Sequence, residues 1–161
     1  MAQSDDANEN EMMGEPDDAL AMLTADHRQV RALFQQYEDT PDLYLKQIIA
    51  EHIFAELTLH MILEEMVFYP VFAEQTDEEG QRLVREALQD HQQLRDLIAT
   101  LQDVEEDEVF EARFHALRDH VEQHVEDEET TMFPQAAQVL ATHGEEITVL
   151  LQERKAQLLA S

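Results

Sequence analysis

Residues 26–34, DHRQVRALF, recur 64 positions later in the chain as DHQQLRDLI at residues 90–98. The same shift places HMILEEMVFYP at 60–70 over HVEDEETTMFP at 124–134. One offset therefore aligns a motif in each of four segments, and the two halves of the chain are copies of one another. Apolar residues recur at helical spacing through all four segments. The repeat predicts two equivalent helix pairs related by approximate two-fold symmetry.

The first helix pair is delimited by periodicity and by capping residues. One helix is predicted over about residues 17–39. Thr40 is the predicted N-cap of the next helix, which would begin at Pro41 and run to about Glu74. Pro70 lies near the end of this second helix and is expected to kink it.

The second helix pair has similar signals. A capping box, TDEE at 76–79, predicts the start of a third helix that runs to about Leu101. An acidic connection at 103–108 then leads to a fourth helix over about 109–140. Four long helices with short connections predict antiparallel neighbours. The expected fold class is therefore all-α, an up-down-up-down four-helix bundle.

The two ends of the chain are predicted to lie outside this bundle of residues 17–140. Residues 1–16 are polar, acidic and without periodicity, which is typical of a disordered tail. At the other end, THG at 142–144 would stop the fourth helix. A short amphipathic fifth helix, Glu145 to Leu159, is predicted within the last segment, residues 141–161, and would pack on the bundle.

The composition excludes several classes of function. There is no Cys, which excludes disulfides, thiolate metal sites, Cys nucleophiles and iron–sulfur clusters. The net charge of −27 would repel nucleic acid, and although it would attract cations, a solvated acidic surface explains it more simply. Neither a membrane-spanning segment nor a signal peptide is predicted, so we expect a cytoplasmic protein without a membrane partner.

Six residues of the repeat form a candidate metal site: His27, His60, Glu64, His91, His124 and Glu128. In the second and fourth helices, His-x-x-x-Glu puts an imidazole and a carboxylate one turn apart on one face. Burying four imidazoles and two carboxylates together is costly without a partner. Two metal ions could each take two His and share both Glu. These nitrogen and oxygen donors suit iron or manganese and are also compatible with zinc or copper.

Neighbouring residues offer further candidates. Glu56 and His120 lie one turn before the His of each His-x-x-x-Glu motif. Either could complete the coordination of one metal ion and make the two ions inequivalent, or could hydrogen-bond to a ligating His instead. Glu65 and Glu129 are predicted to make such hydrogen bonds or to lie on the surface rather than to bridge. Tyr69 is expected in the core or beside the ligands.

The pattern resembles the hemerythrin-like HHE cation-binding family over roughly residues 17–140. The resemblance implies a carboxylate-bridged pair of iron ions (Fe²⁺/Fe³⁺), with a bridging oxo, hydroxo or water, and puts iron ahead of manganese or zinc. Oxygen-carrying hemerythrins take five His, two of them one turn apart on the third helix. Here the positions one turn either side of His91 are Ala87 and Arg95. The missing fifth His argues against reversible oxygen carriage.

The function implied by the resemblance is a non-haem di-iron protein that binds or reduces a small oxidant, namely oxygen, hydrogen peroxide or nitric oxide. Peroxidase-like and catalase-like activities are both compatible with it, and the electron donor is unidentified. The alternative is sensing of oxygen, nitric oxide or iron, or iron handling, without turnover. An inert structural zinc pair is a further alternative. We expect a monomer or a weak homo-oligomer.

Overall fold

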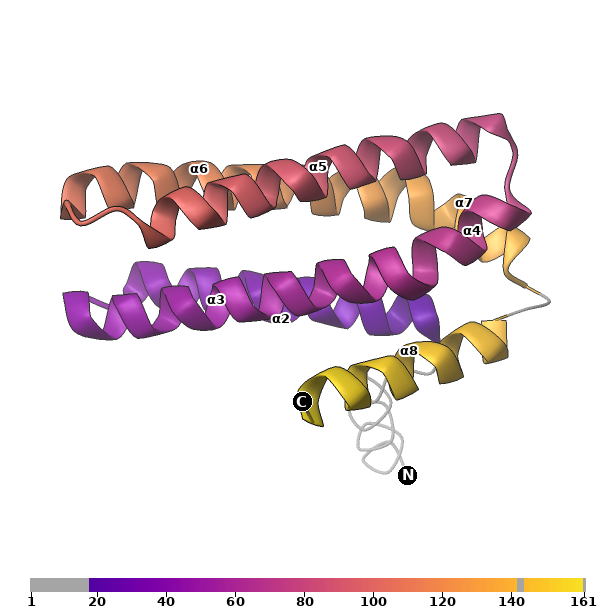
Figure 1. Cartoon of the computed structure of the whole chain (residues 1–161), viewed down its shortest axis with the longest axis horizontal. Coiled ribbons are helices and arrows are strands. Elements are labelled where there is room, and N and C mark those ends of the chain that lie inside the picture. The colour runs from indigo at the N-terminus through magenta and orange to yellow at the C-terminus, as the bar shows by residue number, and fades with distance from the viewer. Residues whose placement is uncertain (1–17, 142–143, 161) are drawn as a thin grey trace, which may run out of the picture.

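The computed structural model describes residues 18–141 and 144–160, so the predicted tail at 1–16 lies outside the described residues. Within them the chain forms helices and no strand: α2 (Ala19–Asp39), α3 (Leu43–Leu63), α4 (Tyr69–Gln75), α5 (Glu78–Gln102), α6 (Asp107–Asp127), α7 (Phe133–Val139) and α8 (Gly144–Ala160). Figure 1 shows α2 running beside α3 and α5 beside α6, with the two pairs stacked on one another. The predicted up-down-up-down four-helix bundle with a short fifth helix is confirmed.

The junction between α2 and α3 differs from the prediction by two residues. Thr40 ends α2, and its backbone N–H bonds to the carbonyl of Tyr37 at 3.3 Å. Asp42 is the N-cap of α3, where its carboxylate accepts a 2.9 Å hydrogen bond from the second helical N–H. A carboxylate also interacts favourably with the positive end of the helix dipole. The helix therefore begins at Leu43 rather than at Pro41.

The start of α5 is shifted by one residue for the same reason. Thr76, the predicted cap, instead ends α4. Asp77 caps α5 by accepting a 3.0 Å hydrogen bond from the backbone N–H of Gly80. The predicted capping box at 76–79 was therefore wrong in register, because an Asp next to a Thr provides the stronger, charged acceptor.

Two π-helical turns interrupt the second and fourth long helices: η1 (Glu64–Phe68) and η2 (Glu128–Met132). In each, a backbone N–H bonds to the carbonyl five residues earlier, Tyr69 to Glu64 and Phe133 to Glu128. Each turn comes just before a proline, which has no N–H to give. The irregularity predicted at Pro70 thus takes the form of a widened turn. Such turns occur mostly as single insertions in α-helices, frequently at functional sites.

Two apolar clusters fill the bundle on either side of the level at which the repeated His residues lie. One contains Phe34, Tyr37 and Phe114, and the other contains Phe68 and Phe72. Along each long helix, one cluster lies toward one end and the other toward the opposite end, and the two meet at the candidate metal residues. Each fully buried side chain of this size contributes roughly 1.5–3 kcal/mol. The candidate site is therefore enclosed by apolar packing along the bundle axis.

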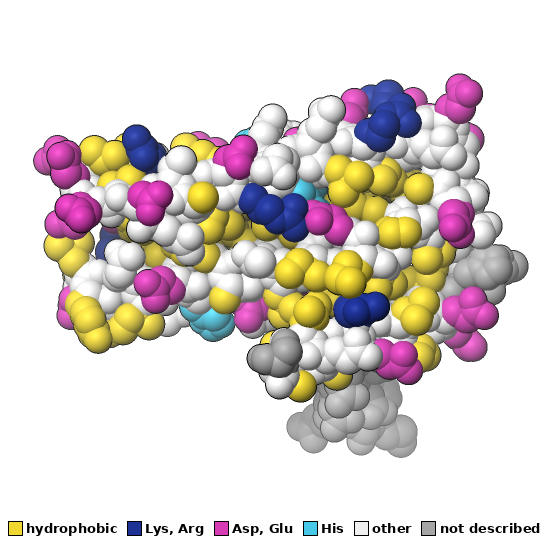
Figure 2. All heavy atoms as spheres, in the orientation of Figure 1, with side chains coloured by type: hydrophobic (Ala, Val, Ile, Leu, Met, Phe, Trp, Pro, Cys, Tyr) yellow, Lys and Arg dark blue, Asp and Glu magenta, His cyan; other side chains and the backbone are white. Residues whose placement is uncertain are grey.

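Helix α8 packs mainly on one helix pair, the pair that includes α2 and α3. It contacts α2, α3 and η1, and it buries Ile147 and Leu151 there. Lys155 of α8 forms an ion pair of 3.4 Å with Asp26 of α2. Figure 2 shows hydrophobic side chains gathered where α8 meets the bundle, with acidic side chains spread over the rest of this face. None of the described helices is long and apolar enough to cross a membrane.

Candidate metal centre

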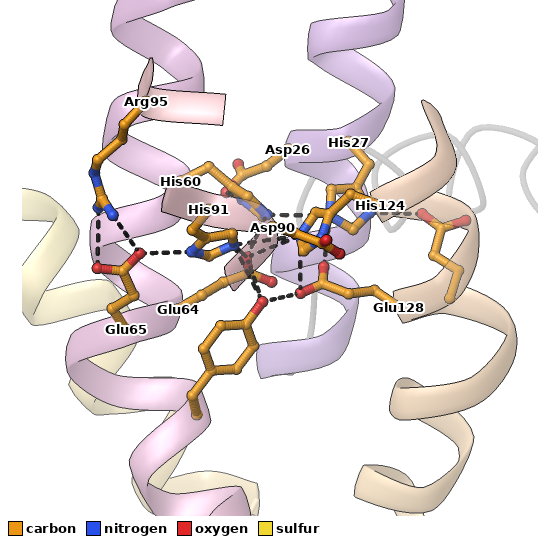
Figure 3. A network of polar contacts seen from close by, with 12 residues as sticks. Asp26, His27, His60, Glu64, Glu65, Asp90, His91, Arg95, His124 and Glu128 are labelled. Carbon is orange, nitrogen blue, oxygen red and sulfur yellow. Dashed lines mark hydrogen bonds and ion pairs between the residues drawn. The ribbon is translucent and has the colours of Figure 1, made fainter. Parts of the chain in front are cut away.

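The six residues predicted from the repeat come together in the middle of the bundle, drawn in Figure 3. Each of them is at most 6% exposed, although all are polar or charged. One His comes from α2 and one from α5, while each His-x-x-x-Glu motif spans the junction of a long helix with its π turn. The two helices of each pair therefore place two imidazoles and one carboxylate at the same level.

The donor atoms form two groups whose members lie within 4.8 Å of one another: His27, His60, Glu64 and Glu128; and Glu64, His91, His124 and Glu128. Both carboxylates belong to both groups, whereas each His belongs to one. Each group also combines side chains from both helix pairs. The geometry is thus that of two adjacent sites joined by two shared carboxylates.

Donor-to-donor distances within the groups suit a metal ion. His27 Nε2 lies 3.1 Å from His60 Nε2, and His91 Nε2 lies 3.2 Å from His124 Nε2. Two donors bound at about 2.1 Å and at right angles to one another are about 3 Å apart. Both His pairs therefore have the separation that two ligands of one metal ion would have.

Each carboxylate reaches both His pairs. Glu64 Oε1 lies 3.3 Å from His60 Nε2 and 3.1 Å from His91 Nε2. Glu128 places its two oxygens separately, Oε1 at 3.2 Å from His27 Nε2 and Oε2 at 3.4 Å from His124 Nε2. This second arrangement, with one oxygen toward each pair, is the one that a bridging carboxylate adopts.

Two buried oxygens of the centre have no hydrogen-bond partner, Oε2 of Glu64 and Oε1 of Glu128. An unsatisfied buried carboxylate oxygen is costly, and native proteins avoid it unless an ion or water takes the place of the partner. These oxygens and the inward-facing Nε2 atoms are all nitrogen and oxygen donors, without sulfur. The residues present therefore fit a pair of divalent transition-metal ions.

Glu65 and Glu129 orient two of the imidazoles from outside. Nδ1 of His27 lies 2.7 Å from Glu129, and Nδ1 of His91 lies 2.6 Å from Glu65, which also pairs with Arg95. A carboxylate on Nδ1 fixes the tautomer, so that Nε2 carries its lone pair toward the interior. Of the two positions that the sequence left open for these Glu residues, hydrogen bonding to a His or the surface, the structure has the first.

Asp26 and Asp90 do the same for the other two imidazoles, and sequence reasoning missed them. Nδ1 of His60 lies 2.9 Å from Asp26, and Nδ1 of His124 lies 3.2 Å from Asp90. Hydrogen bonding to the imidazole is the main reason that the pKa of Asp90 is lowered. The available signal was the Asp that precedes the first His in both copies of the repeat.

The hydroxyl of Tyr69 lies inside the centre. It is 3.1 Å from Glu64 Oε1 and 3.2 Å from His91 Nε2, and it also hydrogen-bonds to Glu128. Burial, followed by the charges of the two carboxylates, raises the pKa of Tyr69 well above its usual value. The hydroxyl therefore keeps its proton and is a donor to the shared carboxylates. Phe133 occupies the equivalent position in the other half and stacks on His27, with ring centroids 5.8 Å apart.

The charges of the metal-free centre are coupled. Burial opposes protonation of His60, but the charge of Glu64 and hydrogen bonds to Asp26 and Glu64 raise the pKa of His60 to about 10. Burial likewise opposes ionisation of Glu64, yet the neighbouring imidazoles lower the pKa of Glu64 well below its usual value. Without metal, protons on imidazoles take the place of cations beside the carboxylates.

Glu56 and His120 do not join either four-residue group. Glu56 is partly exposed and lies 3.5 Å from Nε2 of His52, one turn earlier on α3. His120 is half-buried on α6. Ligation of one metal ion by either residue stays a prediction.

Comparisons with known proteins agree with this geometry. The model of the hemerythrin HHE cation-binding domain matches residues 18–136. The chain belongs to this hemerythrin family. It is also similar to the crystal structure of a hemerythrin HHE cation-binding domain-containing protein from Mycobacterium kansasii, with a TM-score of 0.71 and 20% identity over 89% of this chain and 90% of that one. At that identity the likeness concerns the fold. No curated protein sequence matches the chain significantly.

Membership of the hemerythrin family accounts for the bundle and for the recurrence of His and Glu at one level. The description of the family is that of a cation-binding domain. In the part of the chain that the structure describes, the two four-residue groups are where a cation would have buried donors on several sides. The hemerythrin-like chain thus has, in its core, two groups of buried donors that could hold metal ions.

Proposed function

We propose that this hemerythrin-like chain is a non-haem di-iron protein that binds or reduces a small oxidant, such as oxygen, hydrogen peroxide or nitric oxide. One observation carries the proposal: Glu64 and Glu128 both belong to both groups of donors. Two shared carboxylates suit two metal ions held side by side, and nitrogen and oxygen donors without sulfur suit iron. Bound iron would supply the redox chemistry by exchanging electrons with the oxidant.

In this proposal the chain holds and orients the metal ions with the six buried residues that the repeat predicts. Carboxylates on the four Nδ1 atoms keep each imidazole in the tautomer that can bind a cation. The hydroxyl of Tyr69 holds a proton beside Glu64 and Glu128. The apolar clusters on both sides exclude bulk water along the bundle axis. Glu56 and His120 are proposed as residues that complete one coordination sphere or support it.

A second candidate function is sensing of oxygen, nitric oxide or iron, or iron handling, without turnover. The buried donors favour it as much as they favour catalysis, because metal binding alone would change the charge state of His60. The electron donor, the cytoplasmic location and the monomeric or weakly oligomeric state stay predictions from the sequence.

The test is to load metal-free protein with Fe²⁺ under anaerobic conditions, count the metal by elemental analysis, and record optical spectra before and after adding oxygen or peroxide. The proposal expects two irons per chain, ferric absorption bands and peroxide consumed in excess of the protein. Peroxide consumed only in proportion to protein would favour sensing or iron handling. A chain that retains two zinc ions and a featureless spectrum after iron loading would refute oxidant chemistry.

A further inference from the structure

A cavity of about 230 Å³ opens between α5 and α6 beside the metal centre. It is lined by Leu83, Glu86, Ala87, Asp90, His124, Asp127, Glu128, Thr131 and Met132. His124 belongs to one of the two donor groups and Glu128 to both, and the two residues are at most 5% exposed. Glu86, Asp127 and Thr131 are exposed. The cavity therefore runs from the surface to the donors of the buried centre.

Carboxylates predominate among the charged groups of this cavity. Four carboxylates line it, and among its described lining residues there is no Lys or Arg. Glu86, which forms an ion pair with Arg82 one turn earlier, and Asp127 are at the exposed end, and Asp90 is the partly exposed residue that orients His124. At the buried end, Oε1 of Glu128 has no hydrogen-bond partner. Carboxylate oxygens thus follow one another from solvent to the centre.

The repeat supplies an internal comparison. A shift of 64 residues carries the lining onto Ala19, Met22, Leu23, Asp26, His60, Leu63, Glu64, Val67 and Phe68. Two acidic positions become apolar there, since Met22 replaces Glu86 and Leu63 replaces Asp127. Exposed Thr131 likewise corresponds to Val67, which is buried. The equivalent face of the other helix pair thus lacks the acidic exposed end.

Helix α8 covers that other face. It contacts α2, α3 and η1, and Figure 1 shows it lying along the α2–α3 pair and away from the α5–α6 pair. Lys155 of α8 pairs with Asp26, the counterpart of Asp90. The side chain of Asp26 is accordingly 16% exposed, against 33% for Asp90. One approach to the centre is covered and apolar, and the other is open and acidic.

We propose that the cavity between α5 and α6 is the route by which hydrated divalent cations enter the metal centre, with Glu86 and Asp127 attracting them. The inference rests on the proposed metal centre and adds its entry path. A cleft lined by one sign of charge raises the local concentration of counter-ions and their association rate by roughly 10–10³-fold. Carboxylate oxygens along the wall replace the water molecules that the cation gives up as it moves inward.

The test is the rate at which metal-free protein takes up Co²⁺, added as the chloride and followed by its absorption in a stopped-flow experiment. The double variant Glu86→Gln/Asp127→Asn should load about tenfold more slowly at low ionic strength, with a weaker dependence on salt, and should reach the parent's final stoichiometry. The matched control is Glu51→Gln/Glu105→Gln, which removes two exposed carboxylates that do not line this cavity. Its rate should stay within twofold of the parent's.

A steric variant tests the same route without changing charge. Thr131→Trp puts a large ring at the exposed end of the cavity and should slow uptake at every salt concentration. Loading of both variants at the parent's rate would refute the route while leaving the metal centre intact. Failure of the parent itself to bind Co²⁺ or Fe²⁺ at equilibrium would refute the proposed function and the route with it.

Discussion

Tyr69 and Phe133 occupy equivalent positions in the two halves of the chain, but Tyr69 contacts His91 through a hydroxyl, whereas Phe133 stacks its ring on His27. The same hydroxyl also reaches both shared carboxylates. One donor group therefore has a hydrogen-bond donor beside it, and the other has an apolar ring. The two halves are copies in backbone and in candidate ligands, yet the surroundings of the two donor groups differ chemically.

Removing this hydroxyl should destabilise the metal-free protein. Tyr69→Phe leaves Glu64 and Glu128 without their shared donor, and an unsatisfied buried group costs about 1–3 kcal/mol. We expect the free energy of unfolding, measured with urea, to fall by that amount. Tyr44→Phe is the control, because Tyr44 is 73% exposed. Equal stability of both variants and the parent would mean that the hydroxyl does not support the carboxylates.

Single substitutions should distinguish shared donors from unshared ones. His27 belongs to one group, so His27→Ala should leave one tightly bound metal ion per chain. Glu64 belongs to both, so Glu64→Ala should weaken the binding of both ions. Metal titrations followed by elemental analysis would measure this, with His52→Ala, whose side chain is half exposed, as a control that keeps two ions. Retention of two tight ions by Glu64→Ala would contradict a shared carboxylate.

Metal removal should lower the melting temperature. A metal ion at 100 times its dissociation constant stabilises a fold by about 2.7 kcal/mol. For a chain of this length that corresponds to a rise of about 5–10 °C. Differential scanning calorimetry of metal-free protein with increasing Co²⁺ would measure the rise, and Mg²⁺, which prefers oxygen donors, should give a smaller one. Identical melting with and without Co²⁺ would count against a buried metal centre.

Metal binding should release protons at pH 8. The pKa of His60 is raised to about 10, mainly by Glu64 against the opposing effect of burial, so this imidazole is protonated in metal-free protein at pH 8. A metal ion needs the neutral imidazole and must displace that proton. Calorimetric titrations in two buffers of different ionisation enthalpy should show at least one proton released per chain, and metal affinity should rise from pH 7 to 9. Binding that releases no proton would contradict the assignment.

The imidazole of His60 should also make the stability of the metal-free fold depend on pH. The pKa of His60 is higher in the fold than the ordinary value of about 6.5 in an unfolded chain. Its contribution to stability is therefore fully present below about pH 6.5 and is lost as the pH rises through about 10. Urea unfolding of metal-free protein at a series of pH values would show this loss. His60→Gln should show less of it.

The fold and the six central residues were predictable because both depend on patterns within the sequence. A repeat with one offset aligns His27 with His91 and Glu64 with Glu128, and helical periodicity then puts all of them on inward faces. The hydrogen bonds that Asp26 and Asp90 accept were not predicted, because each comes from a His on the other helix of the same pair. Adjacency in sequence to a His does not say which imidazole an Asp will reach.

Other features could not be predicted because they depend on alternatives of similar energy, between which tertiary packing decides. Thr40 and Asp42 are both acceptable N-caps, and only the path of the chain between α2 and α3 decides between them. The π turns could not be predicted from the spacing of apolar residues, because one extra residue in a turn changes that spacing too little to be recognised. Which face α8 would cover depends on tertiary contacts of Ile147 and Leu151 rather than on local propensity.

The two π turns also bear on whether the extra residue or the duplication of the chain came first. A π turn holds one residue more than the α-helical turn it replaces, and both begin at equivalent residues, Glu64 and Glu128. An insertion shared by both halves indicates that it is older than the duplication. Each donor group also includes a carboxylate from the opposite half. The ancestral half-length chain would therefore have built this centre only as a symmetric dimer, which fusion later made free to diverge.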